Sequence, residues 1–96
     1  MFYAYILQSL RDGRFYYGST SDVKKRLKEH NAGKVRSTKG HRPYRIHYVE
    51  SFPVKKEALK REQYFKSING YNWLREAGII QSRRGGRVVE GASLEN

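Results

Sequence analysis

The sequence contains no cysteine, so it has neither a disulfide framework nor a thiolate site for zinc or an iron–sulfur cluster. A secreted chain of 96 residues would usually need such crosslinks to supplement a small core, so their absence predicts a cytoplasmic protein. No apolar run approaches the roughly 18 residues that a membrane-spanning helix requires. The apolar start, MFYAYILQSL, lacks the basic region and cleavage site of a signal peptide and is expected to form a buried strand.

Acidic residues are also scarce. Nine Asp and Glu oppose twenty Lys and Arg, which leaves a formal net charge of +11. A compact domain with this charge repels itself, and the excess therefore predicts an anionic partner, either nucleic acid or an acidic membrane surface. Eight tyrosines favour nucleic acid, because phenol rings stack on bases and reach phosphates. A membrane-surface helix would instead need a face of Leu, Phe and Trp.

The positive charge is concentrated in one part of the chain. Between Asp22 and Arg45 nine bases oppose two acids, a net charge of +7, whereas residues 81–96 contribute only +1. We therefore expect a basic patch that contacts the phosphates of a nucleic acid. Its candidate nucleic-acid-binding residues are Lys24, Lys25, Lys34, Arg36, Lys39 and Arg42.

The first third of the chain has the pattern of a β-hairpin followed by a helix. Aromatic and branched residues over 3–7 and 15–18 predict two strands, and Gly13 in the intervening turn supplies the positive φ that a hairpin needs. A helix is expected over 23–31, after a run of capping residues. Gly33 is a natural position for the left-handed residue that ends this helix.

The rest of the chain predicts one more strand and two more helices. Residues 34–43 lack apolar periodicity and are expected to form a basic loop, whereas alternation over 44–48 is typical of a half-buried strand. Apolar residues at helical spacing predict a second helix over 54–70, followed by a short last helix. We expect an α+β domain over residues 1–80 and a poorly ordered tail over 81–96.

The first predicted helix carries polar residues on its apolar face. Val23, Arg26, Leu27 and His30 lie at positions i, i+3, i+4 and i+7, which form one face of a helix. Because burying a guanidinium is costly, this face is expected to border a cleft, where Arg26 and His30 can bind a phosphate. The spacing is equally compatible with an Arg26 that extends into solvent and a His30 that interacts with the helix dipole.

A carboxylate and several phenols are further candidates. Glu62 flanks the apolar stripe of the second helix, where it would hold a hard cation such as Mg²⁺ or pair with a neighbouring Lys or Arg. Tyr3 and Tyr5 share one face of the first strand, and Tyr16 and Tyr17 point to opposite faces of the second. One face of the hairpin can thus present phenols from both strands. Nearby cations would favour the phenolate and allow it to act as a general base, although strand tyrosines are most often packing residues. The three histidines are too scattered to form a zinc site.

In order and spacing, these features resemble the motifs of the GIY-YIG endonuclease superfamily, most closely its small bacterial members with a single nuclease domain. The resemblance runs from about Tyr3 to Ile80 and rests on Tyr3-Ala4-Tyr5, Tyr16-Tyr17-Gly18, Arg26, His30 and Glu62. It implies a three-stranded antiparallel sheet flanked by helices in the order β-β-α-β-α-α. It also implies hydrolysis of phosphodiester bonds with one divalent metal, Mg²⁺ or Mn²⁺.

The resemblance also implies roles for individual residues. Tyr5 matches the tyrosine of the first half of the motif, and Tyr16 matches that of the second half, where the family's proposed general base lies. Arg26 matches the arginine that stabilises the phosphate, and His30 matches an auxiliary residue of the site. Glu62 matches the carboxylate that binds the metal.

Some positions depart from the family pattern. Tyr3, Ala4 and Tyr17 replace the glycine and isoleucines after which the family is named, at positions that vary within it. Ser19 occupies a position where the excision-repair relatives carry a lysine near the base tyrosine. The activation of Tyr16 is therefore open, with the histidine of the first helix or a loop lysine as substitutes.

Three functions are compatible with these observations. The leading one is a metal-dependent endonuclease that acts on DNA, on branched or nicked structures of the kind met in DNA repair. The alternative is a nucleic-acid-binding module without catalysis, and the third is a structural protein associated with RNA or the ribosome. A domain this small has little room for its own specificity module, so a protein partner or a homodimer would supply it.

Overall fold

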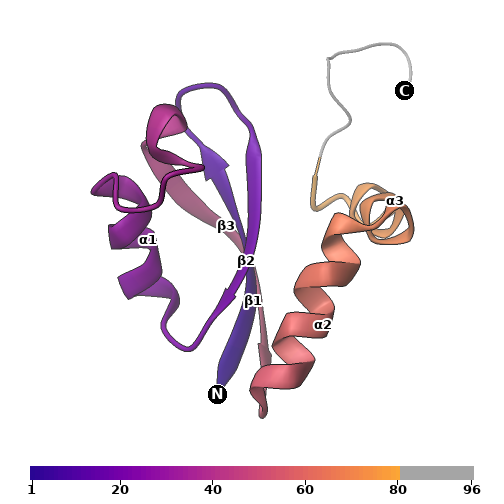
Figure 1. Cartoon of the computed structure of the whole chain (residues 1–96). Coiled ribbons are helices and arrows are strands. Elements are labelled where there is room, and N and C mark those ends of the chain that lie inside the picture. The colour runs from indigo at the N-terminus through magenta and orange to yellow at the C-terminus, as the bar shows by residue number, and fades with distance from the viewer. Residues whose placement is uncertain (81–96) are drawn as a thin grey trace, which may run out of the picture. The chain divides into compact units, whose positions relative to one another are not determined.

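The computed structural model describes residues 1–80, and the predicted tail over 81–96 lies outside the described residues. The described chain contains strands β1 (Phe2–Ser9), β2 (Phe15–Thr20) and β3 (Tyr44–Phe52), and helices α1 (Val23–Asn31), α2 (Lys55–Lys66) and α3 (Ile68–Glu76) (Figure 1). A 3-10 turn, Lys39–His41, precedes β3. This order confirms the predicted α+β class and the β-β-α-β-α-α arrangement.

The described chain falls into two compact units. The first, Met1–Lys66, contains the sheet, α1 and α2, and the second begins at Ser67 and contains α3. No helix of residues 1–80 is both long and apolar enough to span a bilayer.

Strand β1 is the central strand of an antiparallel sheet with the order β2-β1-β3. Its residues from Ala4 to Leu7 are at most 1% exposed, as expected for a strand covered on both faces. Helix α1 lies against one face of the sheet and α2 against the other (Figure 1). Because the strand order is β2-β1-β3, β2 is an edge strand, and side chains from both faces of the sheet can approach one another around it.

The alternation of side chains along the strands divides the core into two parts. Tyr5 and Leu7 pack with Tyr44 on the face that α1 covers. On the opposite face, the rings of Tyr17 and Tyr48 each lie 6.3 Å from the ring of Phe65 in α2. Tyrosines therefore serve both parts of the core, in addition to any chemical role.

The local signals at the hairpin and around α1 predicted these boundaries well. Gly13 in the turn has φ +78° and Gly33 after α1 has φ +80°, the left-handed conformation that glycine adopts without strain. Asp22 precedes α1 and its carboxylate accepts a hydrogen bond from the backbone N–H of Lys25. Helix α1 therefore begins and ends where the capping residues predicted.

The prediction of one helix over 54–70 is wrong. Helix α2 ends at Lys66, and Ser67 adopts an extended conformation whose hydroxyl accepts a hydrogen bond from the N–H of Gly70. Ser67 therefore caps a new helix, α3. The apolar spacing continues across this break, so periodicity alone could not reveal it. The third strand also extends beyond the predicted 44–48, to Phe52.

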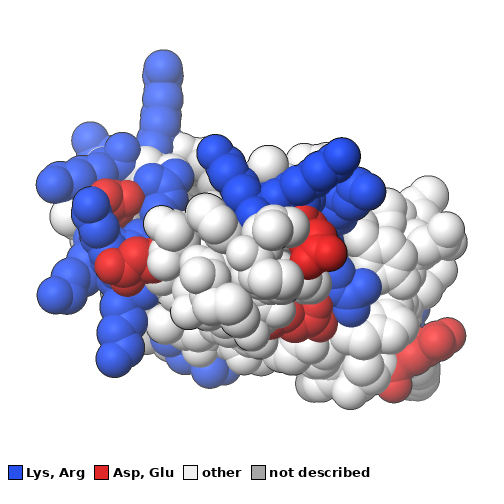
Figure 2. All heavy atoms as spheres, turned by 90° about the horizontal axis from the view of Figure 1, so that it is seen from below, with Lys and Arg blue, Asp and Glu red and all other residues white. Residues whose placement is uncertain are grey.

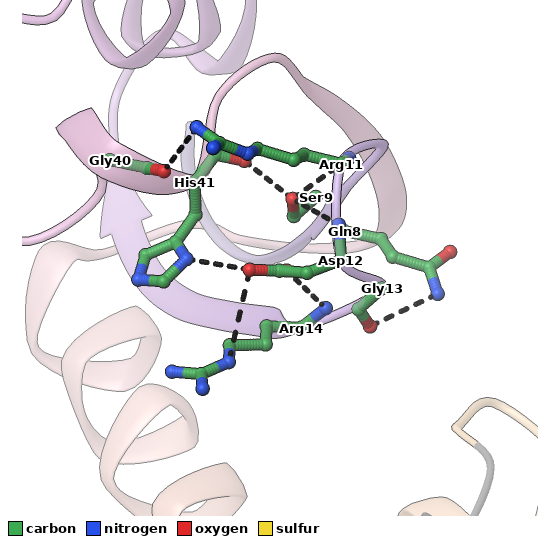
Figure 3. Close-up of polar contacts among 8 residues, drawn as sticks. All are labelled: Gln8, Ser9, Arg11, Asp12, Gly13, Arg14, Gly40 and His41. Atoms are coloured by element: carbon green, nitrogen blue, oxygen red, sulfur yellow. Dashed lines mark hydrogen bonds and ion pairs between the residues drawn. The ribbon is translucent and has the colours of Figure 1, made fainter.

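The turn between β1 and β2 is fastened to the loop that follows α1 (Figure 3). The hydroxyl of Ser9 donates a hydrogen bond to the carbonyl of His41 and accepts from the backbone N–H groups of Arg11 and Asp12. The Nδ1 atom of His41 lies 2.6 Å from a carboxylate oxygen of Asp12, and Arg11 donates to the carbonyl of Gly40. These contacts hold the basic loop against the sheet.

Candidate active site

Tyr5 lies at the centre of the predicted site. Its side chain is 1% exposed, and its hydroxyl lies 3.3 Å from Nε2 of His30. In the sheet Tyr5 is opposite Gly18 of β2, and its ring covers that glycine. A Cβ atom at position 18 would lie 2.6 Å from Cζ of Tyr5, closer than side chains approach in proteins. Gly18 therefore makes room for the phenol of Tyr5.

His30 connects α1 to the basic loop. It is fully buried, and its Nδ1 lies 2.8 Å from the hydroxyl of Thr38. The Thr38 hydroxyl also donates to the carbonyl of Val35, at 3.3 Å. Because that hydroxyl has one hydrogen to donate, we assign the His30 Nδ1–H as donor to Thr38 and Nε2 as acceptor from Tyr5. The imidazole is therefore held between two hydroxyl groups.

Burial keeps both members of this pair uncharged. It lowers the pKa of His30 to about 4, and the positive charge of Arg26 acts in the same direction. Burial also raises the pKa of Tyr5 to about 12, although Arg26 counteracts the rise. At neutral pH the pair is therefore a phenol and a neutral imidazole, and neither group carries charge into the core.

Acidification from about pH 6.5 to about pH 4 is expected to destabilise the fold through His30. The pKa of His30 is about 4 in the folded chain and about 6.5 in the unfolded chain, so in this window the unfolded chain binds a proton that the folded chain does not. The free energy of unfolding therefore falls as pH falls, by about 3 kcal/mol at the acid end. Urea unfolding of the wild type and of His30→Gln at pH 7, 5.5 and 4 measures this loss.

The difference between these two proteins isolates the imidazole, because all other groups titrate in both. A His30→Gln protein that loses as much stability on acidification as the wild type would show that His30 does not titrate in this way.

Tyr16 lies beside the Tyr5–His30 pair. Its ring is 4.7 Å from the imidazole of His30 in an edge-on arrangement and 6.4 Å from the ring of Tyr5. One face of the hairpin therefore does bring two phenols together, Tyr5 and Tyr16. Unlike the Tyr5 hydroxyl, that of Tyr16 forms no hydrogen bond with any of residues 1–80, and its side chain is only half-buried. It is thus available to a water molecule or a substrate.

Arg26 lies at the border of the same group. Its Nη1 pairs with Oε1 of Glu29 at 2.9 Å, and its side chain is 38% exposed. The pairing with Glu29 raises the pKa of Arg26, which stays charged. The guanidinium also lies near enough to the Tyr5 hydroxyl to counteract the rise in that pKa. Arg26 thus presents a fixed positive charge next to the Tyr5–His30 pair.

Glu62 approaches from the α2 side of the sheet. Its Oε1 accepts a hydrogen bond from the Ser19 hydroxyl at 2.7 Å, and its Oε2 pairs with Nζ of Lys66, also at 2.7 Å. The ion pair that was considered for Glu62 is therefore present. The carboxylate also lies within electrostatic range of Tyr5, where its charge raises the pKa of that phenol. Residues from both faces thus meet around the edge strand β2.

The structural roles of two residues could not be predicted from the sequence. Ser19 was noted only as a departure from the lysine of other relatives, yet it orients Glu62. Thr38 lies in a loop that was expected to be solvated, yet it is 1% exposed and holds His30. The only sequence signal for either residue is a hydroxyl near a motif position, and that signal is too common to be informative.

The donor set fits a magnesium ion better than a zinc ion. Among the described residues, no group of three or more His, Cys, Asp or Glu lies close enough together to enclose a metal. Zinc sites in proteins require such a set, whereas Mg²⁺ keeps several waters and often binds through one carboxylate and the oxygens of a substrate phosphate. Glu62 provides a carboxylate of this kind, on a side chain that is 14% exposed.

The predicted basic patch surrounds α1. In Figure 2, Lys and Arg side chains crowd the left side of the molecule, the side on which α1 lies in Figure 1. The six candidates are all exposed, and none of them forms an ion pair with a carboxylate of residues 1–80. They lie on α1 and the loop after it: Lys24, Lys25, Lys34, Arg36, Lys39 and Arg42.

The chain is similar in sequence to UPF0213 proteins of other organisms. A UPF0213 protein of Bacillus licheniformis is 44% identical over 85 residues, which cover 88% of this chain and 84% of that protein. A UPF0213 protein of Halobacterium salinarum is 39% identical over 70 residues, covering 72% of this chain and 90% of that protein. The solution NMR structure of a UPF0213 protein from Bacillus halodurans has 37% sequence identity and a TM-score of 0.47, covering 80% of this chain and 85% of that one.

A family model described as the GIY-YIG catalytic domain matches residues 1–72. This range includes both tyrosine motifs together with Arg26, His30 and Glu62. The family is a nuclease superfamily, and its domain implies binding to nucleic acid, which agrees with the charge of the chain. Because the match covers most of the chain, the chain belongs to the GIY-YIG family, as its motifs predicted.

Proposed function

We propose that this protein is a metal-dependent endonuclease that hydrolyses phosphodiester bonds in DNA, with branched or nicked DNA as its substrate. The observation that carries the proposal is the group formed by Tyr5, Tyr16 and His30, with Arg26 at its border. A half-exposed phenol and a fixed guanidinium that both adjoin the Tyr5–His30 pair offer what phosphodiester hydrolysis requires: a proton acceptor for water and a positive charge for the phosphate.

In this proposal Arg26 binds the phosphate that is cleaved. Its planar N–H donors match phosphate oxygens, and its charge stabilises the negative charge that develops as water attacks. Glu29 holds the guanidinium through one nitrogen, Nη1, and the Tyr5 hydroxyl also lies near the group, which leaves other N–H groups of its five for the substrate. Arg26 thereby remains ordered before the substrate binds.

Tyr16 accepts the proton of the attacking water. Its hydroxyl has no hydrogen-bond partner among residues 1–80, so a water molecule can reach it. Tyr5 and His30 remain uncharged and act as positioning residues: the edge-on imidazole fixes the Tyr16 ring, and the buried Tyr5 hydroxyl fixes the imidazole.

Glu62 is the residue that would hold the divalent metal, Mg²⁺ or Mn²⁺. A bound metal supplies positive charge to the phosphate and the leaving oxygen. The Ser19 hydroxyl fixes the orientation of the carboxylate, and Lys66 neutralises the other oxygen of Glu62 until a metal binds. The basic patch contacts the phosphates of the same nucleic acid away from the reacting group.

One observation favours a second function, a nucleic-acid-binding module without catalysis. Both carboxylate oxygens of Glu62 already have partners within the chain, in Ser19 and Lys66. If Lys66 held the carboxylate too strongly for a metal to compete, the basic patch would still bind nucleic acid. Such a module would bind with an affinity that depends on salt and not on metal.

Incubation with labelled DNA distinguishes the two functions. The purified protein is mixed with flap, nicked, junction and single-stranded DNA, and with RNA of the same sequences, in Mg²⁺, in Mn²⁺ and in EDTA. We expect cleavage of branched or nicked DNA in either metal, its loss in EDTA, and its return when metal is restored. Salt-dependent binding with no cleavage of any substrate in either metal would support the binding module and contradict the endonuclease.

A further inference from the structure

An open pocket of about 250 Å³ lies beside the site described above, between the end of β2 and the start of α2. We propose that this pocket binds a backbone phosphate of the nucleic acid, next to the phosphate at Glu62, and that Lys55 is its cation. The proposal rests on the proposed function, because it places the pocket on the strand that is cleaved. The lining residues are Phe2, Ser19, Thr20, Ser21, Lys55 and Ala58.

The lining of the pocket has the composition of an anion site. Lys55 is its only charged residue, and no carboxylate is among the residues that line it. Three successive lining residues, Ser19 to Ser21, carry hydroxyl groups. Those of Ser19 and Thr20 already donate within the chain, to Glu62 and to the carbonyl of Asp22, whereas that of Ser21 forms no hydrogen bond with any of residues 1–80. An ammonium group together with a free hydroxyl donor can bind a phosphate oxygen. The apolar surfaces of Phe2 and Ala58 suit the sugar that carries the phosphate.

The charge of Lys55 has no carboxylate partner among residues 1–80. Two other cations of the same helix pair with carboxylates: Arg61 with Glu50 at 2.7 Å, and Lys66 with Glu62 at 2.7 Å. Lys55 is exposed and forms no ion pair with any of residues 1–80. As the first residue of α2 it also lies at the positive end of the helix dipole, where a cation is unfavourable. An anion in the pocket would balance this charge.

The position of the pocket relative to Glu62 suggests which phosphate it binds. Ser19 lines the pocket and also donates its hydrogen bond to Glu62. Ala58, another lining residue, precedes Glu62 by four residues on the same face of α2, which is a rise of about 6 Å along the helix. This rise is comparable with the separation of neighbouring phosphates along a strand. The pocket therefore suits the phosphate adjacent to the one that is cleaved.

The test measures DNA binding by the full chain in EDTA, where no cleavage interferes. The dissociation constant for a labelled nicked duplex is determined by fluorescence anisotropy over a range of salt concentrations. For Lys55→Ala we expect about fivefold weaker binding at moderate salt and a salt slope that is smaller by about one, as for the loss of one phosphate contact. Lys56→Ala, the neighbouring exposed lysine outside the pocket, is the matched control and should keep the wild-type slope.

A second variant separates binding from stability. Lys55→Glu places a negative charge at the start of α2, where the helix dipole favours it, so its melting temperature should not fall. Its affinity for DNA should nevertheless fall further than that of Lys55→Ala. A wild-type salt slope in Lys55→Ala, or an equal loss in Lys56→Ala, would overturn the proposal, because the lysine would then act only through the general charge of the protein.

The same variants distinguish this proposal from the proposed function. If the wild type cleaves DNA in Mg²⁺ but Lys55→Ala binds and cleaves as well as the wild type, the pocket assignment is wrong and the endonuclease stands. If the salt slope depends on Lys55 but no metal supports cleavage, the endonuclease is wrong and the pocket remains a phosphate site. If the protein is an endonuclease and the pocket binds a phosphate, Lys55→Ala should raise KM in Mg²⁺. The contact between Lys55 and the phosphate forms when the substrate binds, before the reaction begins.

Discussion

Glu62→Gln is expected to lower the rate of DNA hydrolysis in Mg²⁺ by about a thousandfold, on the order of other losses of transition-state charge stabilisation. The amide has the shape of the carboxylate and can still accept the hydrogen bond of Ser19. It carries no charge, so it holds neither the divalent metal nor the ammonium of Lys66. The measurement is the initial rate on labelled nicked DNA, together with Mn²⁺ binding followed by calorimetry.

Glu57→Gln is the control for this substitution. Glu57 lies on the same helix, is exposed, and forms no ion pair with any of residues 1–80, so its variant should cleave and bind Mn²⁺ like the wild type. Urea unfolding of both variants shows whether the fold is retained. A folded Glu62→Gln protein that cleaves DNA at the wild-type rate would show that the metal binds elsewhere.

Tyr16→Phe is expected to lower the rate by about a hundredfold to ten-thousandfold, the usual contribution of a general base. The phenylalanine ring keeps the edge-on contact with His30, and the hydroxyl that is lost has no hydrogen bond with residues 1–80, so stability should change little. The variant lacks a group to accept the proton of water. The measurement is the rate as a function of pH, in which the rise attributed to the base should disappear.

The neighbouring tyrosine provides a matched control. Tyr17 points to the other face of β2, where its ring packs near Phe65 of α2. Tyr17→Phe should therefore leave the rate and its pH dependence close to those of the wild type. Equal losses in the two variants would mean that both substitutions act through the stability of the hairpin. An unchanged rate in Tyr16→Phe would assign the proton transfer to another group.

Those parts of the fold that depend on local signals could be predicted from the sequence. The hairpin and α1 have their own glycines and capping residues, and the structure places the boundaries where these residues lie. The break before α3 depends on one hydrogen bond, from the N–H of Gly70 to Ser67. A serine within an apolar helical pattern has other uses, so the sequence could not distinguish a cap from a surface residue.

The candidate site could likewise be predicted only in part, because some of its contacts follow local patterns and others depend on the three-dimensional fold. Helical spacing placed Arg26 and His30 on one face of α1, and strand alternation allowed two phenols to meet. The burial of His30 and its bond to Thr38 depend on how the loop folds back over the helix, which periodicity does not describe. The contact between Ser19 and Glu62 joins residues 43 positions apart, and only the three-dimensional fold brings them together.

The central claim is that Tyr16, on one face of the sheet, and Glu62, on the other, act in one active site around the edge strand β2. The most direct test compares the rates of metal-dependent DNA hydrolysis by the wild type, Tyr16→Phe, Glu62→Gln and the double variant. Residues that act as a unit are not additive, so the double variant should be about as slow as the slower single variant. A double variant slowed by the product of the two single losses would contradict a shared site, and a wild type that binds DNA without hydrolysing it would contradict the catalytic account.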